Sequence, residues 1–162
     1  MGSRINNFPI YVVYDRSYLQ KVTLDCGVGQ SISGQASYMI DGDLTSYYGL
    51  SSSGGPMADV HANIIIDYGS LFFNIQLSYK VNFAEAGASI ANATYTVEYS
   101  IDNITWVTLD VGNVRNSNTT LTRSETLLAC RYVRFTNDQD VTSDATAVAT
   151  SVYECRLMGS GF

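Results

Sequence analysis

Two acidic pairs and one histidine are the side chains whose types and spacing could do chemistry. Asp41 and Asp43 stand two positions apart, as do Asp138 and Asp140. Two carboxyl groups can serve as acid and base on a glycosidic bond, but both pairs lie among turn-forming residues, where solvated carboxylates are the ordinary alternative. His61 is the only histidine of the sequence. One histidine cannot form a cluster of histidine metal ligands. A Ser-His-Asp triad would have to use His61, although the sequence has no GxSxG turn to present the serine.

The segment Asp41-Gly42-Asp43 also suits calcium. Calcium takes about six to eight oxygen ligands at roughly 2.3 to 2.6 Å, and the carbonyl groups of a tight turn supply several of them. The alternative is an ordinary Asp-Gly turn. We expect a structural calcium ion at this turn.

Composition excludes several classes of function. The net charge is −6, and the nine basic residues are scattered along the chain, whereas nucleic acids and anionic membranes bind to clusters of basic side chains. No GxGxxG or GxxxxGK[ST] segment offers a phosphate-binding loop. No run approaches the ~20 apolar residues that span a bilayer. We therefore expect a protein that is not an enzyme, does not bind nucleic acid and does not insert into a membrane.

The three cysteines are too few for a disulfide scaffold and lack the CxxC spacing of a zinc site. They are Cys26, Cys130 and Cys155. Buried free thiols are one interpretation, because unpaired cysteine is among the most often buried residue types. A disulfide between Cys130 and Cys155 is the other.

Short stretches of alternating polarity predict that strands position these groups. From Phe73 to Phe83, apolar residues occupy every second position, which is typical of a half-buried strand. Residues 95–99 alternate in the same way and lead through a turn at 102–103 to Trp106, which predicts a hairpin. We expect Ile75, Leu77, Val97, Tyr99 and Trp106 to lie largely inside, and less than about a tenth of the chain to be helical.

A single domain fits the length of 162 residues. Residues 1–30 are expected to form an N-terminal extension packed on a β-sandwich at 31–162. The loops at 50–59 and 137–145 are short, and composition does not change across them, so neither is interpreted as a linker between domains.

A series of segments, in order, resembles the discoidin family, also called factor V/VIII type C or galactose-binding-like domains. The segments are residues 36–48 (ASYMIDGDLTSYY), 64–69 (IIIDYG), 95–106 (YTVEYSIDNITW), 131–135 (RYVRF) and 152–159 (VYECRLMG). The chain departs from the family pattern at Tyr48, Tyr68 and Asn103, where Trp, Leu and Gly are common. The resemblance implies an all-β fold, a galactose-binding-like jelly-roll β-sandwich of two antiparallel sheets.

The resemblance also implies which residues would hold calcium and which would meet a ligand. The calcium ligands would be side-chain or carbonyl oxygens of Tyr38, Asp41, Asp43, Ser46, Tyr153 and Glu154, with Ser46 in place of the usual Thr. The ligand would contact aromatic and polar side chains on loops at one end of the sandwich. The candidates are Tyr47, Tyr48, Asp59, His61, Arg115 and Asn116.

The expected function is therefore a non-catalytic carbohydrate-binding or adhesion module that recognises a neutral or acidic glycan or a glycoprotein. An extracellular place, or the surface of a virion or cell, is expected, although no signal peptide is visible. The alternative is a structural protein of a virion or surface filament that uses the fold for contacts with copies of itself or with neighbouring subunits.

Overall fold

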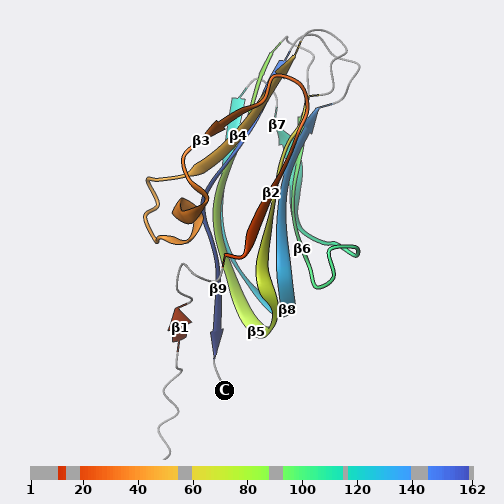
Figure 1. The fold of residues 1–162 in the computed structure, drawn as a ribbon. Coiled ribbons are helices and arrows are strands. Elements are labelled where there is room, and N and C mark those ends of the chain that lie inside the picture. Colours follow the sequence, from red (N-terminus) through yellow and green to blue (C-terminus); the bar gives the residue numbers. More distant parts are fainter. Residues whose placement is uncertain are drawn as a thin grey trace, which may run out of the picture.

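The computed structural model describes residues 11–13, 19–54, 60–87, 93–114, 117–139 and 146–160. Most of these residues belong to strands, and every strand pairing among them is antiparallel (Figure 1). The described part of the chain contains one 3-10 helix, η2 (Ala36–Ile40). No helix in these ranges is long and apolar enough to cross a membrane. The predicted all-β architecture with little helix is confirmed.

The strands follow the chain from β1 to β9. They are β1 (Tyr11–Val13), β2 (Lys21–Cys26), β3 (Ser31–Ser33), β4 (Tyr48–Gly54), β5 (Ala62–Gly87), β6 (Ala93–Ser100), β7 (Val107–Val114), β8 (Ser117–Gln139) and β9 (Thr146–Ser160). Within residues 1–30, β1 pairs with β9 and β2 pairs with β5, so this segment contributes strands to the sheets.

Two long strands, β5 and β8, bend and belong to both layers of the sandwich (Figure 1). Before the bend, β5 pairs with β2 and with the second part of β8, which continues to β6 and β7. After it, β5 pairs with the first part of β8 and with β9, which continues to β4 and β3. We call these layers the β6 sheet and the β9 sheet. The bend coincides with a register shift between Asp67 and Phe72, and Gly69 there has a φ of +80°, which glycine adopts without strain.

Aromatic contacts join the two sheets in the core. The rings of Tyr79 and Phe135 meet edge to face at 5.9 Å, and those of Phe83 and Tyr95 stack at 4.7 Å. Polar contacts also cross the sandwich, because the side-chain amide of Asn137 donates hydrogen bonds to the backbone carbonyl oxygens of Ala84 and Ala149. The two sheets therefore pack face to face, as predicted.

The alternation that predicted the Phe73–Phe83 strand holds except at its first residue. Ile75, Leu77 and Phe83 are buried, whereas Phe73 is 63% exposed. Asn74 has a φ of +49°, and this left-handed residue interrupts the regular pleat between Phe73 and Ile75. The expectation that Phe73 shares the buried face is therefore wrong.

Two further residues expected inside lie only partly inside. Val97 is buried, but Tyr99 is half-buried against the core and Trp106 is half-buried. Trp106 ends the turn before β7, and the guanidinium of Arg134 lies 4.1 Å from the centre of the indole ring. Arg134 stands between two buried residues of β8, so it projects to the outer side of the β6 sheet. The indole therefore packs on this outer side and not in the core.

All three cysteines are free thiols, and the interpretation as buried thiols is right for Cys130 and Cys155, whereas Cys26 is only partly buried. Cys130 and Cys155 are buried, and the Tyr68 hydroxyl donates to the Cys155 carbonyl oxygen at 2.9 Å and lies 3.0 Å from its Sγ. Burial raises the pKa of the Cys130 thiol to about 12. Burial also raises the pKa of the Cys155 thiol. These two thiols therefore act as small apolar core residues.

Candidate functional site

The Asp41–Ser46 loop gathers several of the oxygens predicted to bind calcium. Asp41 Oδ1 accepts the Asp43 amide at 2.8 Å, while the Ser46 hydroxyl lies 3.1 Å from Asp41 Oδ2 and 3.2 Å from the Asp43 carbonyl oxygen. Gly42, with a φ of +78°, makes this tight turn possible. Hydrogen bonds from the Thr45 hydroxyl and amide hold the pKa of the Asp43 carboxyl below its ordinary value. Carboxylate, hydroxyl and carbonyl oxygens at these separations fit a hard cation such as calcium.

Two cationic side chains, Arg156 of β9 and Lys80 of β5, lie against this loop. Glu154 is almost fully buried, and its Oε1 accepts hydrogen bonds from Ser78 Oγ at 2.9 Å and from Arg156 Nη2 at 3.1 Å. Lys80 Nζ donates to the Leu44 carbonyl oxygen at 2.9 Å. Within the described ranges, no three His, Cys, Asp or Glu side chains form a metal-binding group. Calcium would therefore depend on carbonyl and hydroxyl oxygens, and Arg156 would compete for Glu154.

Of the residues predicted to contact a ligand, the three that the structure describes lie on different elements. Tyr47 is exposed, and its ring centre lies 5.3 Å from that of Tyr153 on β9. Tyr48 belongs to β4 and packs against the core. His61 Nε2 lies 3.2 Å from Asp25 Oδ1 on β2. The remaining three predicted contacts lie outside the described residues, namely Asp59, Arg115 and Asn116.

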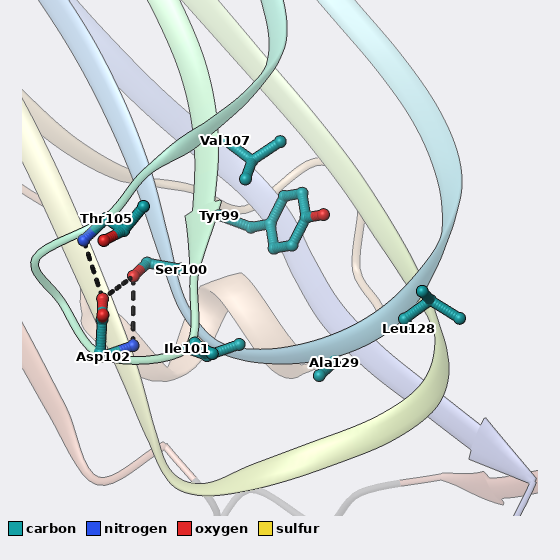
Figure 2. A pocket seen from close by; sticks show the side chains of 8 residues that line it. All are labelled: Tyr99, Ser100, Ile101, Asp102, Thr105, Val107, Leu128 and Ala129. Carbon is teal, nitrogen blue, oxygen red and sulfur yellow. Dashed lines mark hydrogen bonds between the residues drawn. The ribbon is translucent and has the colours of Figure 1, made fainter.

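A recess at the β6–β7 turn combines apolar walls with a polar rim (Figure 2). It encloses about 370 Å³. Its walls come from the end of β6, the turn, the start of β7 and the β8 segment beside the bend. The lining residues are Tyr99, Ser100, Ile101, Asp102, Thr105, Val107, Leu128 and Ala129.

Hydrogen bonds within the turn fix the rim of this recess (Figure 2). Asp102 Oδ1 accepts the amides of Ile104 and Thr105, each at 2.8 Å, and the Ser100 hydroxyl at 3.0 Å. Hydrogen bonds from the backbone amides of Thr105 and Ile104 are the main reason that the pKa of the Asp102 carboxyl is lowered. Asp102 therefore remains a negatively charged hydrogen-bond acceptor at the mouth of the recess. Its position is set by the backbone of the turn.

The walls of the recess are apolar and open to solvent. Figure 2 shows the Tyr99 ring beside Val107, with Leu128 across the recess. Leu128 is 83% exposed, and Ile101 and Val107 are about half exposed. Such a surface can cover the C–H face of a pyranose ring, while a carboxylate and hydroxyls take its polar groups.

A second cleft lies on the outer face of the β6 sheet. We call it the outer cleft, and its volume is about 340 Å³. It spans four strands, and its lining is mainly polar. The lining residues are Asp25, Asn63, Ile65, Thr96, Glu98, Arg134, Thr136 and Asp138.

Sequence reasoning missed the residues of both clefts, apart from weighing Asp138 as half of an acidic pair. The hairpin that ends at Trp106 was predicted, so the turn residue Asp102 had a usable signal. No sequence signal pointed to Leu128, because its position beside the β6–β7 turn depends on where β8 bends. Glu98 and Arg134 occupy polar positions of alternating strands, yet only the β6–β8 register makes them partners.

No protein-family model matches the chain, and no curated protein sequence is significantly similar to it. Solved structures with a similar arrangement include three carbohydrate-binding modules. CBM32 of AlyQ, in complex with 4,5-unsaturated mannuronic acid, has a TM-score of 0.40 and 17% identity, over 83% of this chain and 97% of that one. Chitosan-binding module 1 of a chitosanase/glucanase from Paenibacillus sp. IK-5 has a TM-score of 0.44 and 19% identity, over 90% and 99%.

The third is the family 32 module of NanJ from Clostridium perfringens in complex with galactose. Its TM-score is 0.44 and its identity is 14%, over 88% of this chain and 95% of the module. At these identities and TM-scores, the likenesses carry no argument about what this chain binds. The function is therefore argued from the chain's own residues.

Proposed function

We propose that this protein is a non-catalytic glycan-binding module, and that the recess at the β6–β7 turn is a binding site. One observation carries the proposal: the recess has aromatic and aliphatic side chains in its wall, and a carboxylate and hydroxyl groups held in place at its rim. Tyr99, Val107 and Leu128 would cover the apolar face of a sugar ring. Asp102 would accept hydrogen bonds from its hydroxyl groups.

A non-catalytic role is supported by how the acidic pair at 41–43 is used. Both carboxylates accept hydrogen bonds from the loop's own backbone, so they shape a turn. His61 Nε2 lies 3.2 Å from the exposed carboxylate of Asp25. These contacts favour binding over acid-base catalysis.

The affinity of one such open site should be weak. We expect a dissociation constant between the high-micromolar and millimolar range, or about −4 to −6 kcal/mol. Display in several copies on an extracellular, virion or cell surface would compensate, because linked sites raise the effective concentration of the ligand. Adhesion to a glycoprotein is a function that suits such display.

A glycan array probed with tetramerised protein tests the proposal, followed by calorimetry on the best ligand. Leu128→Ser and Asp102→Asn should each weaken binding at least about fivefold, the size expected for one lost contact. Val111→Ser is the matched control, because Val111 is 61% exposed and does not line the recess. A blank array, or variants that bind as well as the wild type, would contradict the proposed function.

We also propose that a structural calcium ion binds at the Asp41–Ser46 loop. Its ligands would be oxygens of Tyr38, Asp41, Asp43, Ser46, Tyr153 and Glu154. The ion would bridge the carboxylates of Asp41 and Glu154 and so hold this loop against β9. Saturating calcium should raise the melting temperature by roughly 5 to 10 °C relative to chelator, and Asp41→Ala should abolish the difference. Coincident curves for protein shown to be metal-free would remove calcium from the account.

A structural role in an assembly is the second candidate, and exposed apolar side chains favour it. Phe73, Ile104 and Leu128 are each more than 60% exposed, and apolar surface of this kind becomes buried in contacts between subunits. The partner would be a second copy of this chain. Light scattering after size exclusion should then show oligomers that Phe73→Ser and Leu128→Ser convert to monomers. A wild-type protein that stays monomeric at high concentration would eliminate this candidate.

A further inference from the structure

The outer cleft is separate from the recess, and no residue lines both. Its side chains project from four neighbouring strands, β2, β5, β8 and β6. They alternate with buried residues such as Ile64, Val97 and Phe135, so they stand on the face that points away from the β9 sheet. The cleft is therefore an outward-facing surface of the β6 sheet and not part of the core.

A fixed ion pair forms one wall of the outer cleft. Arg134 donates to Glu98 Oε2 through Nε at 2.8 Å and through Nη2 at 2.6 Å. The Trp106 ring covers the guanidinium at 4.1 Å. The side chains of Arg134 and Glu98 are only 28% and 14% exposed, so the indole and the ion pair hold each other in place. Groups that are already ordered lose less conformational entropy when a ligand binds.

Hydroxyl and amide groups line the rest of the cleft. The hydroxyls of Thr96 and Thr136 lie 2.5 Å apart, and Asn63 Nδ2 lies 3.4 Å from Asp25 Oδ2. Asn63 Oδ1 accepts a hydrogen bond from the backbone amide of Asn137 at 3.2 Å, which fixes the Asn63 side chain. The cleft therefore presents both hydrogen-bond donors and hydrogen-bond acceptors. Sugars, whose hydroxyls both donate and accept, match this arrangement better than an apolar ligand does.

The charge of the cleft narrows the class of sugar. Among the described residues that line it, the carboxylates of Asp25 and Glu98 outnumber the guanidinium of Arg134, and that guanidinium already faces Glu98. A carboxylate on the ligand would meet net negative charge, whereas a hydroxyl or an ammonium group would not. The cleft should therefore reject uronic and sialic acids.

We propose that the outer cleft is a second saccharide-binding site, specific for neutral sugars and amino sugars, with Arg134, Glu98 and Asp25 as its principal polar contacts. This inference rests on the proposed glycan-binding function. Two separated sites on one module would let it hold two glycan segments, which raises avidity without new contacts in either site.

Amide chemical shifts of the labelled full chain test this inference. Three probes are used: a glucosamine tetramer, a neutral galactose tetramer and a galacturonic acid tetramer. The first two should shift the amides of Asn63, Thr96 and Arg134, and the galacturonic acid tetramer should not. Arg134→Gln should weaken binding at these amides by at least about tenfold, the loss expected for one charge-assisted hydrogen bond.

One control variant and one further test variant keep the test independent of folding. Arg123→Gln removes a comparable arginine that pairs with Asp110 outside the cleft, and it should leave binding unchanged. Asp25→Asn alters an exposed side chain, so the variant protein should fold normally and still bind the glucosamine tetramer more weakly.

Each result separates the two proposals. Shifts confined to residues 99–107 and 128–129 would overturn the outer cleft and leave glycan binding in place. Tighter binding of the galacturonic acid tetramer in the cleft would overturn the charge argument. No shift with any tetramer, together with a blank glycan array, would end both proposals.

Discussion

Asp67→Asn is expected to destabilise the bend that shapes the recess. Asp67 ends the first part of β5, and its carboxylate binds Arg131 of β8 through two hydrogen bonds of 3.0 and 3.1 Å. It also accepts the Gly69 amide at 2.7 Å. The same stretch of β8 leads back to Ala129 and Leu128 in the wall of the recess. Losing the charge should therefore loosen both the bend and the recess.

The size of the effect follows from the exposure of the pair. A hydrogen bond to a charged group contributes about 1.5 to 3 kcal/mol when it is shielded, but an exposed ion pair contributes under about 1 kcal/mol. The side chains of Asp67 and Arg131 are 19% and 35% exposed, which lies between these cases. We expect Asp67→Asn to lower the free energy of unfolding by about 1 to 2 kcal/mol, and the melting temperature by roughly 2 to 8 °C.

The effect should depend on pH with a definite sign. Burial alone would raise the pKa of the Asp67 carboxyl, but hydrogen bonds from Arg131 and the Gly69 amide outweigh it and hold the pKa below its ordinary value. A carboxyl whose folded pKa is lowered stabilises the protein above its unfolded pKa of about 3.9 and loses this contribution as the pH falls through the folded value. The wild type and Asp67→Asn should therefore converge in strong acid.

Urea unfolding at pH 7 and near pH 3 measures both quantities. Asp25→Asn is the control, since Asp25 is 64% exposed, and it should change the free energy of unfolding by less than about 0.5 kcal/mol. Equal stability of Asp67→Asn and the wild type at pH 7 would refute the reasoning. So would a difference of unchanged size in acid.

Three other outcomes are expected. Tyr68→Phe should cost about 1 to 2 kcal/mol in urea unfolding, because it leaves the buried Cys155 carbonyl oxygen without its hydroxyl donor; an unchanged midpoint would speak against this. Arg156→Gln should enlarge the calcium-dependent melting shift by releasing Glu154, and a smaller shift would count against the proposed ligand. In the native protein the two buried thiols should resist a thiol reagent for hours, while all three react after denaturation; rapid reaction of every thiol without denaturant would show that the core is more open.

Patterns within a few residues were enough to predict much of the fold. Alternating polarity placed the strands from Ile75 to Phe83 and at residues 95–99, and the turn at 102–103 marked the hairpin. These predictions succeed because the pleat makes side chains alternate whatever the strand pairs with. The turn in the Asp41–Ser46 loop was predictable because it too is local: its hydrogen bonds join residues at most five positions apart.

Only the tertiary structure decided where the clefts lie. Arg134 pairs with Glu98, which is 36 positions away, and Leu128 lines the same recess as Val107 because β8 bends beside the β6–β7 turn. The same bend, with Asn74 in a left-handed conformation, turns Phe73 out of the core. Strand neighbours and register are set by packing over the whole chain, and a local pattern does not encode them. The sequence by itself therefore determined which residues could form strands and turns, while the packing of the two sheets determined which of them line the same cleft.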